Sequence, residues 1–287
     1  MPCATITAAS VATAHPLARV DRGDVRLRLA SAAVLAPLAL AAAWLGGPYL
    51  AVLVLAAAAG MGWEWARLTS SAALPITALT VLATSAPILV AVVGSPRAAL
   101  GLAAVGAAAV WIAARGAGAR APGWAALGTV AIVLPCLACL RLAADPAAGR
   151  GTILWLFATV WASDTGAFLA GRRFGGPRLA PRLSPNKTWA GSVGGVAAAA
   201  AVGGAAAILS DGTAAILVPA GIVLGLAAQL GDLAESLAKR RFGVKDSSGL
   251  IPGHGGLLDR LDGLLAAAAV QFLMTLWAGS SPIAWRV

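Results

Sequence analysis

The sequence predicts an all-α, polytopic integral membrane protein, and three observations support this class. Hydrophobic residues make up 60% of the chain and charged residues only 11%, and the mean hydropathy is +0.85. The apolar residues come in runs of about 20, the length that a helix needs to cross a hydrocarbon core. Spanning segments must satisfy their backbone polar groups internally, and the period-two alternation of a membrane barrel is absent.

Nine spans are predicted, and alanine and glycine dominate them, which allows membrane helices to approach closely. A polar N-terminal tail, 1–26, precedes the first span, and spans one to five occupy 27–150. The C-terminal membrane region, 151–287, contains two polar loops, 171–188 and 233–259. The expected spans are 27–45, 48–66, 74–94, 98–114, 123–142, 151–170, 189–209, 214–232 and 260–278.

The distribution of basic residues predicts that the N-terminus is cytoplasmic. With nine spans and this orientation, 17 of the 21 Lys and Arg residues fall on the cytoplasmic side. This asymmetry follows the positive-inside rule. It also puts both polar loops on the cytoplasmic face. The four basic residues on the far side are Arg97, Arg141, Arg150 and Arg286.

The formal net charge of +10 would suggest nucleic acid as a partner in a soluble chain. In a membrane protein it is explained by basic cytoplasmic loops, with a further contribution from phosphate-rich ligands, so no nucleic acid is expected. Cys136 and Cys139 lie inside an apolar run without a second Cys/His pair nearby. They are therefore interpreted as small helix-packing residues rather than as a zinc site.

Carboxylates gather at the expected end of span eight and the start of span nine. Asp232, Glu235 and Lys239 share one helix face, and Asp259 and Asp262 share another. Carboxylates at a membrane boundary normally pair, face a wet cavity or bind a cation. Hard oxygen ligands beside phosphate suit Mg²⁺.

A structural alternative stays open for these carboxylates. Asp232 could pair with Lys239, and Asp259 with Arg260, without any ligand. The surplus of carboxylates favours the metal site over pairing alone.

The sequence "PGHGG" around His254 predicts a turn that exposes backbone N–H groups to an anion. His254 is a candidate to donate to a phosphate or to assist proton transfer. Solvation in a loop is the alternative for a lone histidine.

The other loop adds Asp164, Ser184, Lys187 and Thr188 as candidates. Asp164 lies near the end of span six, where an unpaired charge is costly, and an ion pair with Lys187 is the alternative. "SPNKT" leads into span seven, and a helix N-terminus beside a lysine is a natural phosphate site.

Glu64 is expected to have only a local structural role, because it lies three residues before Arg67 in span two. This spacing predicts an ion pair within the helix. The chain contains neither a P-loop, nor a dinucleotide-binding glycine motif, nor H-E-x-x-H.

The run "SLAKRRFGVKDSSGLIPGHGGLLDRLD", Ser236 to Asp262, resembles the hallmark of the CDP-diacylglycerol synthases, or phosphatidate cytidylyltransferases. Its elements are S-x-x-K-R, then K-D, then P-x-H-G-G-x-x-D-R-x-D. "SDTGAF", "GRRFG" and "LSPNKT" resemble the second block of that family. Together these motifs cover about residues 161–263, and the earlier spans match only in being hydrophobic.

The resemblance implies that CTP and phosphatidate react to give CDP-diacylglycerol and pyrophosphate at the cytoplasmic face of the inner membrane. It implies Mg²⁺ held by Asp232 and Asp259, allows a second cation such as K⁺, and assigns Lys239 and His254 to catalysis with these carboxylates. Asp246 and Asp262 belong to the motif, and either is expected to orient a basic partner. The residues implied to bind the nucleotide or substrate phosphates are Asp164, Ser184, Lys187, Thr188, Lys239, Arg240, Lys245, His254 and Arg260.

One position departs from the family pattern: Ala190 stands where a glutamate is expected, which keeps an inactive relative among the alternatives. A transporter with polar gating loops and a CTP-dependent lipid kinase are the other rivals. The loop charges argue against the first and the Ser236–Asp262 pattern against the second. Small residues on the helices also suggest a homodimer.

Overall fold

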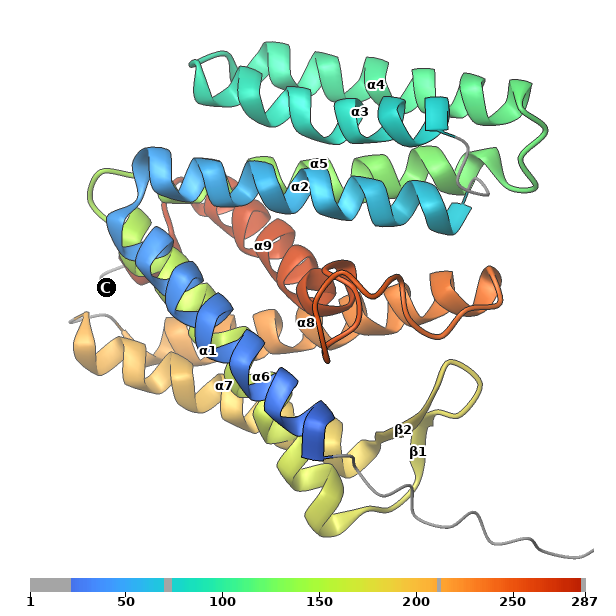
Figure 1. Cartoon of the computed structure of the whole chain (residues 1–287). Helices are drawn as coiled ribbons and strands as arrows, with labels where there is room; N and C mark the ends of the chain where they lie inside the picture. Colours follow the sequence, from blue (N-terminus) through green and yellow to red (C-terminus); the bar gives the residue numbers. More distant parts are fainter. Residues whose placement is uncertain (1–21, 70–73, 211–212, 285–287) are drawn as a thin grey trace, which may run out of the picture.

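The computed structural model describes residues 22–69, 74–210 and 213–284, and this part of the chain is predominantly helical (Figure 1). Eight of its helices, α2 to α9, are long and apolar enough to cross a membrane, and α1 contributes a shorter apolar stretch, Ala30–Leu45. The predicted all-α polytopic fold is confirmed. The helices are α1 Arg22–Leu45, α2 Gly47–Thr69, α3 Leu74–Val92, α4 Pro96–Gly116, α5 Pro122–Ala143, α6 Gly149–Phe174, α7 Trp189–Leu209, α8 Ala214–Arg241 and α9 Leu258–Ala278, followed by a 3₁₀ turn, Pro282–Ala284.

The predicted bounds of the loop 233–259 are wrong at both ends. Helix α8 continues to Arg241, and α9 begins at Leu258, so only 242–257 connects them. Hydropathy marks where a helix leaves the hydrocarbon, whereas "AESLAKRR" contains good helix formers that continue the helix in a polar setting. The candidate carboxylates of α8 therefore project from a rigid helix.

The predicted loop 171–188 is also partly structured. Helix α6 runs to Phe174, and a short antiparallel hairpin follows, formed by β1 Arg178–Ala180 and β2 Ser184–Thr188. The sequence predicted a polar loop here and did not identify the hairpin. The predicted tail 1–26 lies mainly outside the described residues.

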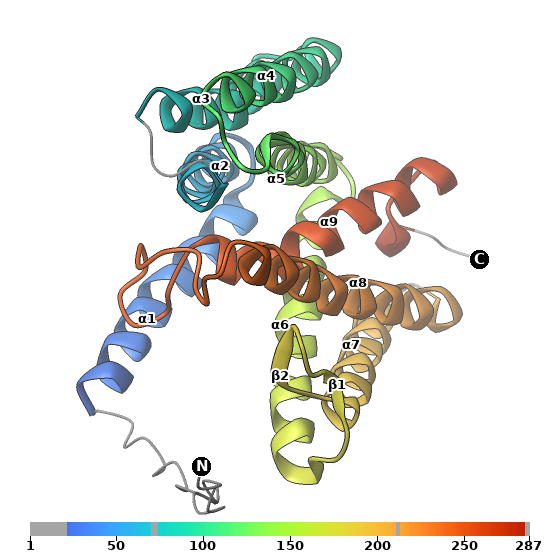
Figure 2. The same cartoon turned by 90° about the vertical axis from the view of Figure 1, so that its right-hand side faces the viewer.

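The helices form two groups that α9 joins (Figures 1 and 2). Helices α2 to α5 pack on one another, and α6, α7 and α8 form the second group. Helix α9 contacts α5 in the first group and α6 and α8 in the second. The N-terminal end of α9 therefore lies where both halves of the chain can reach it.

Large apolar side chains cover much of the outer surface, as expected for helices that face lipid. Trp277 on α9 is 88% exposed and Leu209 on α7 is 87% exposed. Inside, Cys136 packs in the hydrophobic core shared by α2, α5, α6 and α9, and Cys139 is half-buried beside it. A chain with this outer surface is an integral membrane protein.

Small residues allow α7 to approach both of its neighbours. A Cβ atom on Gly166 of α6 would lie 2.7 Å from the carbonyl oxygen of Gly194 on α7. A Cβ on Gly225 of α8 would lie 2.6 Å from the Cβ of Ala199 on α7. The small-residue faces of α7 thus serve packing within the chain.

Gly128→Ala is expected to destabilise the protein by about 1–3 kcal/mol, because added core volume forces neighbours apart. Gly128 on α5 lies against the indole of Trp65, whose Nε1 donates to the carbonyl of Trp124 at 3.0 Å. The matched control is Gly123→Ala on the same helix, where nothing lies within 4 Å of the new Cβ. Thermal unfolding in detergent tests this, and an equal midpoint for both variants would contradict it.

Candidate active site

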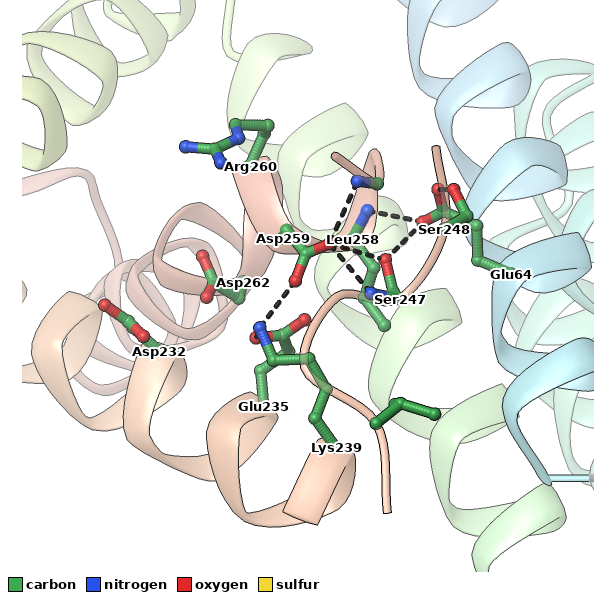
Figure 3. A network of polar contacts seen from close by, with 12 residues as sticks. Glu64, Asp232, Glu235, Lys239, Ser247, Ser248, Leu258, Asp259, Arg260 and Asp262 are labelled. Carbon is green, nitrogen blue, oxygen red and sulfur yellow. Dashed lines mark hydrogen bonds and ion pairs between the residues drawn. The ribbon is translucent and has the colours of Figure 1, made fainter. Parts of the chain in front are cut away.

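Three carboxylates converge where the end of α8 meets the start of α9. Asp232 and Glu235 project from α8 and Asp262 from α9, with one oxygen of each lying within 4.8 Å of the others (Figure 3). Glu235 is buried, whereas Asp232 and Asp262 are half-buried. The carboxylates that the sequence placed at the end of span eight and the start of span nine therefore meet in the fold.

Lys239 lies at the centre of a second set of contacts. Its Nζ atom is 2.5 Å from Glu235 Oε2 and 2.5 Å from Asp259 Oδ1. The Lys239 side chain is 12% exposed, and those of Glu235 and Asp259 are each 6% exposed. The pairing alternative had matched Lys239 with Asp232 and Asp259 with Arg260, so the partners differ from that interpretation.

Asp259 has both carboxylate oxygens engaged by the protein. Oδ1 faces Lys239, and Oδ2 accepts from the N–H groups of Ser247 and Gly256 at 2.9 Å each and from Ser247 Oγ at 2.8 Å. A carboxylate with this many donors holds the loop against α9. The structure therefore places Asp259 beside the three converging carboxylates rather than among them.

The N–H groups of the glycine-rich turn donate to acceptors within the protein. The N–H groups of His254 and Gly255 donate to the carbonyl of Ile251, and that of Gly256 donates to Asp259. The N–H groups of Leu257 and Leu258 donate to Glu64. The predicted exposure of the turn's N–H groups to a substrate anion is therefore wrong for residues 254–256.

The hairpin contributes Lys187, whose Nζ is 2.5 Å from Asp232 Oδ2. The alternative pairing of Lys187 with Asp164 is thus replaced by one with Asp232, and Asp164 lies exposed on α6. Thr188 caps α7, because its Oγ1 accepts from the N–H of Gly191 at 3.0 Å. This cap fixes the end of the hairpin and holds Lys187 near α8.

The arginines of the motif make backbone contacts. Arg260 donates from Nε and one terminal nitrogen to the carbonyl of His254, at 2.9 and 2.6 Å. Arg240 donates to the carbonyls of Leu183 in the hairpin and Val244, at 3.3 and 3.1 Å. Both side chains are exposed.

The remaining predicted residues lie in the loop after α8 and in the hairpin. His254 is half-buried, and its Nδ1 lies 2.7 Å from Ser31 Oγ of α1. Ser184 is half-buried at the start of β2. Lys245 and Asp246 are exposed in the loop after α8.

Sequence reasoning missed Glu64, and the predicted Glu64–Arg67 pair is wrong. Glu64 is fully buried on α2 and binds the loop and the start of α9, while Arg67 stacks on Trp63 at 5.0 Å from the ring centre. A carboxylate in an apolar run needs partners, and that signal was assigned to the nearest basic residue. Ser247 and Ser248 also lie inside the motif but were not predicted as site residues.

The charges of the centre leave room for a cation. The carboxylates of Asp232, Glu235, Asp259 and Asp262 face the ammonium groups of Lys187 and Lys239. These four carboxylates outnumber the two ammonium groups, and clustered carboxylate oxygens are the ligands that divalent hard cations prefer. Fold and site together define an integral membrane protein with a mixed acidic and basic centre, which is typical of enzymes that transfer phosphate-containing groups.

Comparison with known proteins gives the family. The profile of the cytidylyltransferase family matches residues 26–277. A phosphatidate cytidylyltransferase of Pseudomonas aeruginosa is 38% identical over 267 residues, which cover 88% of this chain and 97% of that protein. The chain therefore belongs to the cytidylyltransferase family, as the motifs predicted.

Other relatives match over a shorter stretch at higher identity. The phosphatidate cytidylyltransferase of Brucella suis is 52% identical over 130 residues, 45% of this chain and 48% of the relative. That of Haemophilus influenzae is 45% identical over 129 residues, 43% of this chain and 45% of the relative. In these alignments the chain spans about half the length of the curated relatives it matches.

Proposed function

We propose that this chain is a phosphatidate cytidylyltransferase. A phosphate oxygen of phosphatidate attacks the α-phosphorus of CTP, the bond between the α-phosphorus and its bridging oxygen breaks, and pyrophosphate leaves, which gives CDP-diacylglycerol. The supporting observation is the convergence of Asp232, Glu235 and Asp262 with Lys187 and Lys239 at one end of the helices. Attacking and leaving groups are both anionic, so catalysis is mainly positioning and charge neutralisation.

Mg²⁺ fits the donor set, and Asp232 with Asp262 and Glu235 would hold it. The cation would neutralise charge on the triphosphate when bound. The sequence prediction paired Asp232 with Asp259; the engaged oxygens of Asp259 favour Asp262 as the second ligand. Asp259 then orients Lys239, and K⁺ remains a candidate for a second cation.

The basic groups around the centre would bind phosphates. Lys187 and Lys239 are held by carboxylates and would turn toward the triphosphate as it enters. Asp246 would orient a basic partner, and Asp164, Ser184 and Thr188 would shape the nucleotide side of the site. The exposed or half-buried donors available for the two substrates are Arg240, Lys245, His254 and Arg260.

The site would face the cytoplasm from an inner membrane, because soluble CTP must meet a lipid head group there. The excess of basic residues on that side supports this orientation. A homodimer is a further part of the proposal, since small residues also occur on outer helix faces.

The test uses purified chain in micelles with phosphatidate, Mg²⁺ and CTP labelled at the α- or γ-phosphate. Only α-label is expected to enter the lipid fraction, and EDTA is expected to abolish transfer. Label from the γ-position in lipid would establish a lipid kinase instead. If folded protein moves neither label into the lipid fraction, the result would favour the transporter or the inactive relative.

A further inference from the structure

Glu64 lies outside every motif of the site, yet its carboxylate is bound by the loop and by α9. It is fully buried on α2. Oε1 accepts from the N–H of Leu257 at 2.7 Å and from Ser248 Oγ at 2.5 Å, and Oε2 accepts from the N–H of Leu258 at 2.6 Å (Figure 3). Ser247 Oγ lies 3.3 Å from Oε2.

These contacts supply the cap that α9 lacks locally. The first N–H groups of a helix have no partner within it, and Leu257 at the N-cap position has no side-chain cap of its own. A negative carboxylate at a helix N-terminus is also stabilised by the helix dipole. Glu64 therefore fixes the first turn of α9, which carries Asp259 and Asp262, from a different helix.

A continuous chain of contacts connects Glu64 with the acidic centre. Ser247 Oγ lies between Glu64 Oε2 and Asp259 Oδ2, at 3.3 and 2.8 Å. Asp259 then contacts Lys239, which contacts Glu235. Gly256 allows this approach, because a Cβ there would lie 2.8 Å from both Asp259 Oδ2 and Glu64 Oε1.

We propose that Glu64 is a positioning residue for cytidylyl transfer. It ties the N-terminal half of the chain to the loop 242–257 and sets the orientation of Asp259 and Asp262. This inference rests on the proposed function and extends it to α2, which contributes no group to the converging carboxylates. The mechanism is indirect: Glu64 holds the backbone from which the site carboxylates project.

The first test compares Glu64→Gln with Arg67→Gln, one turn further along α2. Glu64→Gln keeps the shape of the side chain, but its amide NH₂ group would face the N–H groups of Leu257 and Leu258, which are themselves donors. We therefore expect kcat to fall about 10–100-fold, as for other groups that orient ligands. The Mg²⁺ concentration for half-maximal rate is expected to rise, and KM for CTP to change less than kcat. Arg67→Gln is expected to change neither kcat nor KM by more than about twofold, because surface changes away from such contacts have small effects.

Ser247→Ala provides a second variant that leaves Glu64 in place. If both act through Asp259, the combined variant is expected to lose less than the product of the two single losses, since residues in one network are not additive. If the loss in the combined variant instead equals the product of the two single losses, the two residues act independently. That result would contradict the connection through Ser247. A kcat of Glu64→Gln equal to that of the wild type would overturn the proposal outright.

Limited trypsin cleavage after Lys245, in the exposed loop, gives a readout that does not depend on activity. Glu64→Gln is expected to be cleaved several-fold faster than the wild type at a temperature where both are folded, because opening of the loop is favoured. Arg67→Gln is expected to match the wild type. If wild-type protein transfers no label, the proposed function fails while this cleavage ratio still decides the Glu64 contact, and an unchanged ratio refutes it.

Discussion

Asp262→Asn is expected to lower the rate of CDP-diacylglycerol formation by about 10²–10³-fold, the usual cost of removing one preorganised electrostatic group. Asp262 and Asp232 approach from different helices, and with Glu235 their oxygens lie within 4.8 Å of one another. Asparagine keeps the size of the side chain but removes one negative charge from the proposed cation site. The loss is therefore expected mainly in kcat and in the Mg²⁺ requirement.

Transfer of α-label to lipid at several Mg²⁺ concentrations measures this effect. Asp145→Asn is the matched control, because Asp145 lies in the turn before α6, where its carboxylate accepts from the N–H groups of Ala147 and Ala148. A loss of the same size in both variants would indicate a general folding defect. Wild-type rates in Asp262→Asn would refute the proposed ligand set and return the role to Asp259.

Lys239→Met is expected to reduce both stability and activity. Its removal leaves Glu235 and Asp259, each 6% exposed, facing each other without a cation. Breaking a buried pair in this way costs about 3–5 kcal/mol. Activity is also expected to fall about 10²-fold, because the variant loses a positive charge that neutralises the triphosphate.

Thermal unfolding in detergent and label transfer measure the two effects separately. Adding Asp259→Asn to Lys239→Met is expected to recover part of the stability, because one of the two facing charges is removed, but none of the activity. Lys245→Met, in the exposed loop, is the control for stability. Unfolding of Lys239→Met at the wild-type temperature would show that Lys239 does not hold the two carboxylates.

Ala190 bears on whether the enzyme is active. It lies half-buried in the first turn of α7, where the family pattern has a glutamate. Glu235 and Asp262 already provide carboxylates at the centre, together with Asp232. The proposed chemistry therefore does not depend on a carboxylate at position 190, and the label-transfer experiment tests this directly.

The sequence by itself determined the membrane fold and the family, and it named most of the charged groups of the candidate site. Runs of about 20 apolar residues specify spanning helices almost independently of context, because lipid leaves the backbone no other solution. The spacings of Asp232 with Glu235 and of Asp259 with Asp262 are local, so helical geometry alone puts each pair on one face. The ends of α8 and α6 were less predictable, since hydropathy falls before the helix ends.

Only the tertiary structure decided which charges meet. Lys187 and Asp232 are joined by the packing of the hairpin beside α8, and Glu64 meets residues 257 and 258 because α9 lies between the two helix groups. Sequence spacing favours the nearest partner, which is why Arg67 was assigned to Glu64 and Arg260 to Asp259. Pairing across nearly 200 positions depends on how helices pack, and buried carboxylates bind whichever donors that packing brings to them.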